Sequence, residues 1–479
     1  MKRPNFLFIC SDQHNADFTG YAGHSVQKTP ALDSLAREGI VFRQAYCQNP
    51  LCVPSRASMM MGKYSKNIGI YENRHIMQSN NDTLPRLLSR EGYHTCMIGK
   101  THINGEQYQG FDQRPYGDIY GQAHQPDPRR TPEKGESGLG DILLDSGPSG
   151  IPLAMTQTEI CVAEAVKWLQ IYNYGKSANP FFCCVNFDKP HFPINPPERY
   201  FNSYAGKVTL PEQKCDYIRE KAVPFVKKAV EQNGLWEHYG INREFHEKTL
   251  AAYCGCIEWV DNAMGRIVDA LDYMGLGKDT IVIYTSDHGE MACQKGFWQK
   301  SVFFDQSARV PLIIRYPERF SGGRELESPV GLIDMFPTIC SLAGIEPSSD
   351  CDGEDLTSYL LSGAPLSRKE IFCESAVLKV PEHAGCMLRT EKWKYNYYLD
   401  GFEELYDMSV DPLEDANLCN DSTLNELKQT LKEKVIVFWE PDKQLKRYAE
   451  TPLMRHEKHF YFYSNQFVTG DGKIVDAAP

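Results

Sequence analysis

The segment Cys52-Val53-Pro54-Ser55-Arg56 brings together residues that could do covalent chemistry on an anion. Cys52 supplies a sulfur nucleophile, and Arg56 supplies a permanent cation about one helical turn later. The run that follows, 57–61, favours a short helix that ends at Gly62. Free N–H groups and the helix dipole attract anions at a helix N-terminus. The segment therefore predicts an oxyanion site that contains a nucleophile.

Four apolar runs elsewhere in the chain are each followed by polar side chains that suit catalysis or metal binding. The runs cover residues 6–10, 94–98, 181–187 and 280–285, and the polar clusters after them are Asp12/Gln13, Lys100/His102, His191 and Asp287/His288. Short continuous apolar runs are typical of strands buried on both faces of a parallel sheet. Ligands of such sheets bind beyond the carboxyl ends of the strands. We therefore expect the four clusters to meet at one edge.

Two carboxylates in these clusters, Asp12 and Asp287, together suit a hard divalent cation, and the amide oxygen of Gln13 adds a further ligand. His102 and His191 are candidates for acid–base catalysis or hydrogen bonding near neutral pH. A single Asp is more often a helix cap or a turn residue, and a single His is more often structural. The metal prediction depends on both carboxylates reaching the same edge of the sheet.

Positive charge is available from Arg56, Lys100 and Lys300. Taken alone, each of these residues is more often a surface residue. Beside a cation site and an anion-binding helix end, however, they suit a negatively charged group in transfer. The residues together predict hydrolysis of an anionic ester.

The elements that must position these residues alternate between strands and helices. The helices are expected near 30–38, 82–91, 158–172 and 245–273, with further strands at 40–42 and 310–315. This order predicts an α/β domain, residues 1–365, with a large mostly parallel sheet flanked by helices. Residues 113–155 lack a periodic pattern and predict a long surface loop.

The pattern of predicted strands and helices changes after residue 365. Short antiparallel strands are expected at 371–373, 386–389 and 392–398, then a turn at 404–412 and a helix at 424–439. Residues 366–479 are therefore predicted to form a smaller α+β subdomain with a short antiparallel sheet and an aromatic tail. The tail could cap the active site or mediate self-association.

The bulk composition excludes several other classes. The net charge of −12 over 479 residues argues against nucleic acid as the main partner. No apolar run approaches the ~18 residues of a membrane span. The first apolar run is too short for a signal peptide, so a cytoplasmic location is expected unless a leader was removed. Most of the 16 cysteines are expected to be buried, reduced thiols.

Several segments resemble blocks of the formylglycine-dependent sulfatases, in the alkaline-phosphatase superfamily. The resemblance spans roughly residues 4–420, and the blocks follow the family order. They are Pro4-Asn5, Cys52-Val53-Pro54-Ser55-Arg56 with Gly62-Lys63, Gly99-Lys100-Thr101-His102, Pro190-His191-x-Pro193, Ser286-Asp287-His288-Gly289-Glu290, Lys300, Arg309-Val310-Pro311, Asp334-x-x-Pro337-Thr338 and Glu404-Leu405-Tyr406-Asp407 with Asp411-Pro412. The resemblance implies an alkaline-phosphatase-like fold.

The resemblance also implies a mechanism. A formylglycine-generating enzyme would oxidise Cys52 to formylglycine, whose hydrate is the nucleophile. One hydroxyl of the hydrate would attack sulfur, and the other would then expel sulfate from the covalent sulfo-enzyme. By family position, the metal would be bound by Asp12, Gln13, Asp287, His288 and Cys52. Lys100 and Lys300 would bind sulfate, and Arg56 and His102 would stabilise the hydrate. His191 would protonate or bind the leaving oxygen.

This sequence departs from the family pattern at three positions. Many members have Asp where this chain has Gln13, Asn where it has His288, and Thr where it has Met61. Calcium is the usual ion, but fewer carboxylates and an imidazole leave magnesium or manganese open.

The substrate class stays open between sulfated carbohydrates and aryl or steroid sulfates. Asn73 is polar enough to contact a sugar, although the segment 73–76 could equally be a turn. A phosphate or phosphonate monoester hydrolase of the same superfamily is the alternative enzyme, and a non-catalytic binding protein is the alternative class. The intact Ser55 and the Lys100/His102 pair favour sulfate. A homo-oligomer is a further possibility.

Overall fold

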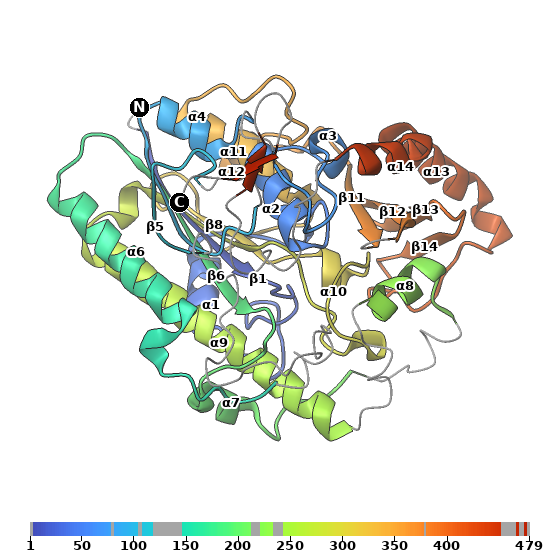
Figure 1. The fold of residues 1–479 in the computed structure, drawn as a ribbon, viewed down its shortest axis with the longest axis horizontal. Helices are drawn as coiled ribbons and strands as arrows, with labels where there is room; N and C mark the ends of the chain where they lie inside the picture. Colours follow the sequence, from blue (N-terminus) through green and yellow to red (C-terminus); the bar gives the residue numbers. More distant parts are fainter. Residues whose placement is uncertain are drawn as a thin grey trace.

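The computed structural model describes residues 3–77, 81–103, 108–117, 146–211, 221–232, 243–377 and 380–451, with two short strands beyond them. The largest sheet in this part of the chain has eight strands in the order β5-β4-β6-β1-β7-β8-β2-β9 (Figure 1). The five strands β5, β4, β6, β1 and β7 are parallel to one another. β8 runs antiparallel to β7 and β2, and β9 is parallel to β2. Their bounds are β1 (Asn5–Asp12), β2 (Ile40–Phe42), β4 (His94–Gly99), β5 (Gln113–Gly117), β6 (Phe181–Pro190), β7 (Thr280–Ser286), β8 (Leu312–Arg315) and β9 (Arg324–Leu326).

Both faces of this sheet are covered, which explains the continuous apolar runs of its strands. In β1, Phe6 and Phe8 pack into one hydrophobic core while Leu7 and Ile9 pack into another. Successive side chains of a strand point to opposite faces, so a strand between two helical layers must be apolar throughout. The helices are α1 (Pro30–Glu38), α6 (Gln157–Tyr174) and α9 (Arg243–Tyr273) on one face, and α2 (Cys52–Met61), α4 (Leu84–Arg90) and α11 (Met335–Ala343) on the other (Figure 1).

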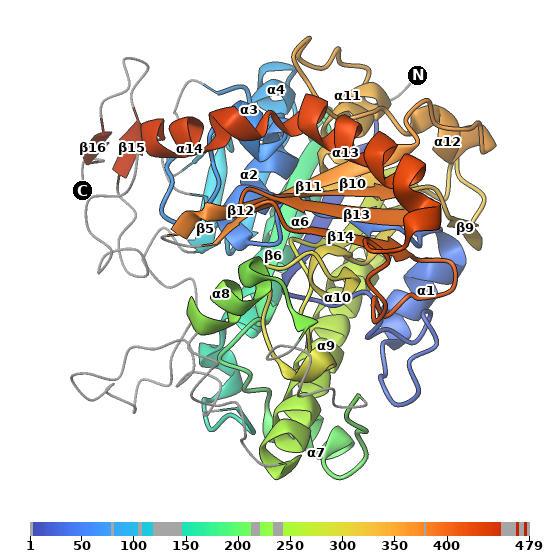
Figure 2. The same cartoon turned by 90° about the vertical axis from the view of Figure 1, so that its right-hand side faces the viewer.

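A second, four-stranded antiparallel sheet follows in the C-terminal part of the chain. Its strands are β11 (Glu370–Val377), β12 (Val380–Thr390), β13 (Trp393–Tyr398) and β14 (Glu403–Asp407). Helix α13 (Asn425–Trp439) packs across β12 and β13, and α14 (Pro441–Glu450) continues beyond it (Figure 2). The predicted fold class, a large mostly parallel sheet with a smaller antiparallel one, is confirmed.

Short elements connect these layers. They are β3 (Ala45–Tyr46), α3 (Ser65–Ile68), α7 (Glu198–Tyr204), α8 (Pro224–Gln232), α10 (Asp305–Ala308), β10 (Val330–Gly331), α12 (Thr357–Ser362), β15 (Gln466–Val468) and β16 (Ile474–Asp476). None of the helices in the described ranges is long and apolar enough to cross a membrane. Every cysteine in those ranges is a free thiol, and most are buried.

Two predictions of irregular structure were wrong. Residues 113–117, expected in a long loop, form the edge strand β5, which pairs only with β4. Pro115 argues against a strand in the sequence pattern, but a strand at the edge of a sheet tolerates a proline. Residues 404–407, expected in a turn, belong to β14, where Leu405 and Tyr406 are buried. The rest of the expected loop at 118–145 and the tail segment 452–465 lie outside the described residues, and the boundary at 365 stays a prediction.

A buried ionic group joins the second sheet to helix α10. The ammonium group of Lys394 donates to Asp305 Oδ1 at 2.6 Å, to Glu414 Oε1 at 2.8 Å and to the carbonyl of Phe303 at 2.9 Å. The backbone N–H of Asp305 donates to Glu414 Oε2 at 2.7 Å. We call Asp305, Lys394 and Glu414 the junction cluster. Because its donors and acceptors satisfy each other, it fixes the second sheet against the loop after Lys300.

Candidate active site

The register of the large sheet brings the predicted strand-end residues to one edge. β1 lies between β6 and β7, with Asp12 paired to Pro190 and Ser11 paired to Ser286. His191 and Asp287, each the next residue after one of these partners, therefore lie close to Asp12. β4 is parallel to β6 and ends at Gly99, next to Lys100. The four polar clusters thus meet at the same edge, as the sequence predicted.

Helix α2 begins at Cys52 and lies entirely in the interior. Its C-terminus is closed by Gly62 at φ 65°, where an added Cβ would lie 2.8 Å from Phe336. At its N-terminus, the backbone N–H of Val53 donates to Asn73 Oδ1 at 3.1 Å, and the hydroxyl of Ser55 donates to the carbonyl of Asp287. These contacts fix the start of the helix against the sheet edge. Asn73 caps the helix, and its predicted contact with substrate stays a prediction.

Arg56 links the nucleophile helix to three strand ends. Its Nε lies 2.7 Å from Asp287 Oδ2, one terminal nitrogen lies 3.2 Å from Asp12 Oδ2, and the other donates to the carbonyl of Lys100 at 3.0 Å. The Lys100 ammonium also pairs with Asp12 Oδ2. All four side chains are at most 1% exposed. The guanidinium therefore holds one oxygen of each carboxylate and leaves the other oxygen for a different partner.

The four residues Asp12, Cys52, Asp287 and His288 each offer a potential metal-ligand atom, and these atoms all lie within 4.8 Å of one another. His288 Nε2 is 3.8 Å from Asp12 Oδ1, 3.7 Å from Asp287 Oδ1 and 3.1 Å from Cys52 Sγ. His288 Nδ1 lies 3.0 Å from the carbonyl of Gly289, which favours the tautomer with its proton on Nδ1. The Nε2 lone pair then faces the carboxylates, so this donor set fits a divalent cation.

Gln13 connects this group to Lys300. Its amide oxygen accepts from the Lys300 ammonium, its amide nitrogen donates to Glu290 Oε2, and its backbone N–H donates to Asp287 Oδ1 at 3.2 Å. Glu290 is fully buried, and burial raises the pKa of its carboxyl group. Sequence reasoning gave Glu290 no role. Its only signal was its place at the end of the block that contains Asp287.

The buried charges set the ionisation of the site. Burial alone would raise the pKa of Asp12, but the charges of Lys100 and Arg56 outweigh it and hold that pKa well below its usual value. Burial and the Asp12 carboxylate raise the pKa of the Cys52 thiol to about 11. The unmodified thiol is therefore protonated near neutral pH, and a protonated thiol is a poor nucleophile.

The environment of the two predicted catalytic histidines favours their neutral forms. Burial and the charge of Lys300 hold the pKa of His191 well below its usual value. Its Nδ1 lies 2.6 Å from the carbonyl of Phe192, and its Nε2 lies 3.9 Å from Asp12 Oδ1. His102 is also buried, and burial with the nearby Lys100 charge lowers its pKa in the same way.

The structure therefore gathers nearly all of the predicted site residues. We call the charged and ligating core of the site the site cluster, defined as Asp12, Cys52, Arg56, Lys100, Asp287, His288 and Lys300. Gln13 bridges this cluster internally, and His191 and His102 lie in its electric field. Within it, three cations surround two carboxylates, an arrangement that suits an anionic substrate and a metal ion together.

A parallel sheet with such an edge suits the hydrolysis of anionic esters beside a bound metal ion. A family model described as Sulfatase matches residues 4–345, and one described as N-sulphoglucosamine sulphohydrolase, C-terminal, matches residues 293–440. The chain belongs to the sulfatase family. It is 30% identical over 453 residues to the uncharacterized sulfatase YidJ of Escherichia coli (strain K12), which covers 91% of this chain and 87% of that protein.

Two solved structures share the fold. One is a complex of an enzyme with its substrate D-glucosamine-2-N,6-O-disulfate, with a TM-score of 0.72 and 22% identity over 95% of this chain and all of that one. The other is the phosphonate monoester hydrolase of Agrobacterium radiobacter, with a TM-score of 0.74 and 24% identity over the full length of both chains. The fold alone therefore does not separate sulfate from phosphonate chemistry.

Proposed function

We propose that this sulfatase hydrolyses a sulfate monoester of a carbohydrate, an aryl alcohol or a steroid at the site cluster. The observation that carries the proposal is the position of Cys52. It lies at the N-terminus of α2, 3.1 Å from His288 Nε2 and among the carboxylates and cations of the sheet edge. A sulfate ester bound there would meet a nucleophile, a metal and three cations at once.

Cys52 is the proposed precursor of formylglycine, formed by a maturating enzyme. The family resemblance carries this proposal, and a protonated thiol would itself attack sulfur poorly. A formylglycine hydrate supplies one hydroxyl for attack on sulfur and a second whose deprotonation expels sulfate and restores the aldehyde. Peptide mass spectrometry of the active protein tests this step. The aldehyde or its hydrate is expected at position 52, and only unmodified thiol there would overturn it.

The proposed metal ligands are Asp12, Asp287 and His288, with the side chain at position 52 and Gln13 as further candidates. A divalent cation in this place would neutralise charge on a sulfate oxygen. Calcium is our first choice because two carboxylates are present, and magnesium or manganese would also suit this donor set. Arg56 would keep the carboxylates oriented, since it holds one oxygen of each.

Lys100 and Lys300 are the proposed sulfate ligands, and His191 is the proposed partner of the leaving oxygen. In the neutral tautomer with its proton on Nδ1, His191 offers only a lone pair at Nε2. Protonation of the leaving oxygen therefore requires the imidazolium form. His102 and Arg56 are proposed to stabilise the hydrate.

The main alternative is a phosphate or phosphonate monoester hydrolase, which shares the fold. Ser55 and the Lys100/His102 pair favour sulfate by family resemblance. Turnover of 4-nitrophenyl sulfate, 4-nitrophenyl phosphate and 4-nitrophenyl phenylphosphonate by one preparation separates the two. Sulfate is expected to give the highest kcat/KM, and a higher value for either phosphorus ester would overturn the proposal. A homo-oligomer and a cytoplasmic location stay predictions.

A further inference from the structure

The carboxyl group of Glu290 is the centre of a buried hydrogen-bond network beside the site cluster. Glu290 is fully buried, on the loop that follows β7. Its Oε1 accepts from the backbone N–H of Ala292 at 3.0 Å and from the backbone N–H of Gln299. Its Oε2 accepts from the side-chain amide of Gln13. Glu290 thereby ties the end of β1 to both ends of the loop that leads into Lys300.

The backbone of this loop needs such support. The segment 291–301 holds five non-glycine residues in the left-handed region, with φ from 46° to 81°, and these are Ala292, Cys293, Lys295, Gln299 and Ser301. Conformations of this kind persist only where the surrounding contacts hold them. The N–H of Met291 also donates to the carbonyl of Gln299 at 2.8 Å. The Glu290 carboxyl group and this bond together fix the backbone on the N-terminal side of Lys300.

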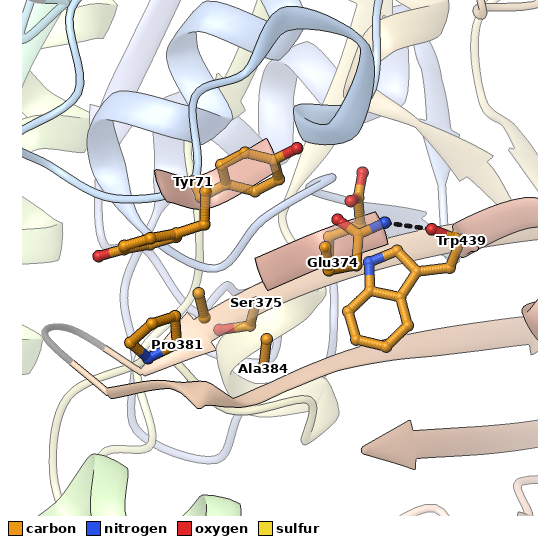
Figure 3. Close-up of a pocket in the computed structure, with 9 residues that line it drawn as sticks. Tyr71, Glu374, Ser375, Pro381, Ala384 and Trp439 are labelled. Carbon is orange, nitrogen blue, oxygen red and sulfur yellow. Dashed lines mark hydrogen bonds between the residues drawn. The ribbon is translucent and has the colours of Figure 1, made fainter. Parts of the chain in front are cut away.

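The C-terminal side of Lys300 is held from two other directions. The N–H of Ser301 donates to the carbonyl of Pro50 at 3.1 Å, and its carbonyl accepts from the hydroxyl of Ser375 at 3.2 Å. Figure 3 shows Ser375 beside the buried Glu374 on β11. Lys300 therefore stands between two anchored neighbours.

The side-chain amide of Gln13 completes the link between Glu290 and Lys300. An ammonium group can only donate, so the amide oxygen faces Lys300 and the amide nitrogen donates to Glu290. The backbone of Gln13 is itself fixed, at φ 68°, by the hydroxyl of Tyr253, which donates to the Gln13 carbonyl at 2.7 Å. Glu290 thus decides which end of the amide meets the ammonium. A reversed amide would turn its NH₂ group toward a cation.

We propose that Glu290 is a positioning residue, which holds Lys300 at the anion site through Gln13 and the backbone of Gln299. This role deepens the proposed function and rests on it for the binding of sulfate by Lys300. Lys300 would, however, meet an oxygen of a sulfate, phosphate or phosphonate ester in the same way. The positioning role and the choice of ester can therefore fail separately.

A double-mutant cycle on kcat/KM for 4-nitrophenyl sulfate tests this role. Glu290→Gln keeps an oxygen for the two backbone N–H groups, but it places an NH₂ group against the amide nitrogen of Gln13. It should lower kcat/KM by about 10- to 100-fold, the effect of one hydrogen bond to a charged group. In the Lys300→Met background the same substitution should cost less than about threefold, whereas in the Lys100→Met background it should keep its full effect.

A reciprocal exchange separates positioning from a general structural role. In Gln13→Glu/Glu290→Gln, a carboxylate again faces Lys300, an amide again donates across the pair, and the net charge is unchanged. This variant should be at least about fivefold more active than Glu290→Gln alone.

Asp261→Asn is the matched control, because Asp261 is a buried carboxylate that accepts from the backbone N–H groups of Ala31 at 3.1 Å and Leu32 at 2.7 Å. It should lower the free energy of unfolding and leave kcat/KM within about twofold of the wild type.

An equal loss from Glu290→Gln in the wild-type and Lys300→Met backgrounds, or no recovery in the exchange variant, would overturn the positioning role. If Glu290→Gln does not fold, Gln13→Met takes its place in the cycle, with the same coupling to Lys300 expected. If the wild type prefers a phosphate or phosphonate ester, the proposed function fails, and the same cycle on that ester decides the role of Glu290. Turnover of none of the three esters would overturn both proposals.

Discussion

The site cluster and the junction cluster are both buried groups of opposite charges, yet they are built differently. In the junction cluster, Lys394 donates to one oxygen of each carboxylate and to the carbonyl of Phe303. The second oxygen of Glu414 accepts from the backbone N–H of Asp305, and the second oxygen of Asp305 accepts from the hydroxyl of Tyr46. In the site cluster, Arg56 and Lys100 take only the Oδ2 oxygens, and the Oδ1 atoms of Asp12 and Asp287 face His288. The charged groups of the junction cluster bond to one another. In the site cluster, Asp287 Oδ1 accepts from the backbone N–H groups of Gln13 and His288, and it still lies within 4.8 Å of the other potential metal-ligand atoms.

The junction cluster therefore serves the stability of the fold, whereas the site cluster serves the binding of a metal and an anion. A buried ion pair that loses one partner leaves an uncompensated charge, which destabilises the fold strongly. A site with surplus cations holds its charges close together at a cost in stability and gains affinity for an anion in return. Substitutions in the two clusters should therefore have opposite signatures, and the following predictions test that contrast from the largest expected effect to the smallest.

Lys394→Met should reduce the free energy of unfolding by about 3–5 kcal/mol, because Asp305 and Glu414 lose the cation between them. Chemical denaturation measures this loss. Below the unfolding transition, the kcat for an aryl sulfate should stay close to that of the wild type. Lys392→Met, on an exposed lysine that pairs with Asp407 at 3.2 Å, is the control and should cost less than about 1 kcal/mol. Equal stability of the two variants would refute the structural role of the junction cluster.

Lys300→Met should have the reverse signature. Its kcat/KM for an aryl sulfate should fall by about 10²–10³-fold, the usual effect of removing one charge-stabilising donor. Its free energy of unfolding should fall by about 1–3 kcal/mol at most, because the amide oxygen of Gln13 loses its donor. Arg56 and Lys100 still balance the carboxylates. A variant that unfolds easily but turns over normally would remove Lys300 from the site.

Calcium should stabilise the protein through the site cluster alone. After treatment with a chelator, calcium at about 100 times its Kd should add about 2.7 kcal/mol to the free energy of unfolding. Asp287→Asn should abolish this gain, whereas Glu414→Gln in the junction cluster should keep it. Magnesium and manganese in parallel titrations identify the preferred ion. An identical calcium effect in Asp287→Asn would place the metal elsewhere.

The junction cluster should make stability depend on pH. Burial raises the pKa of Glu414 to about 7, although Lys394 opposes this rise. The folded state therefore binds a proton more tightly than the unfolded state, and the resulting stabilisation is full below pH 4.5 and lost as the pH rises toward 7. Between pH 4.5 and 6 the loss should be about 2 kcal/mol, since one proton corresponds to about 1.4 kcal/mol per pH unit. Glu414→Gln should flatten this part of the profile, and an unchanged slope would contradict the assignment.

Most residues of the site cluster could be predicted from the sequence, because the patterns that identify them are local. The apolar runs at 6–10 and 280–285 identify buried strands, and a polar residue directly after such a strand must lie at the sheet edge. Lys300 had no such signal beyond its charge, and its sulfate-binding role came from the family resemblance. Its link to Gln13 appears only in three dimensions.

The junction cluster and the buried carboxyl group of Glu374 could not be predicted from the sequence, for a physical reason. Asp305, Lys394 and Glu414 are ordinary charged residues, far apart in the chain, and only the packing of the second sheet removes them from water. Glu374 likewise lies in a strand pattern that gives no sign of its buried carboxyl. Tertiary packing, rather than local pattern, decides which of many acids and lysines become buried.

The central claim is that sulfate ester hydrolysis depends on the side chain at position 52. The direct measurement is sulfate release from an aryl sulfate by Cys52→Ala, beside Cys254→Ala, which removes an equally buried thiol from α9. Cys52→Ala should release no sulfate above background while unfolding at nearly the wild-type temperature, and Cys254→Ala should stay active. Turnover by Cys52→Ala within about tenfold of the wild type, less than 1.4 kcal/mol in activation free energy, would contradict the claim.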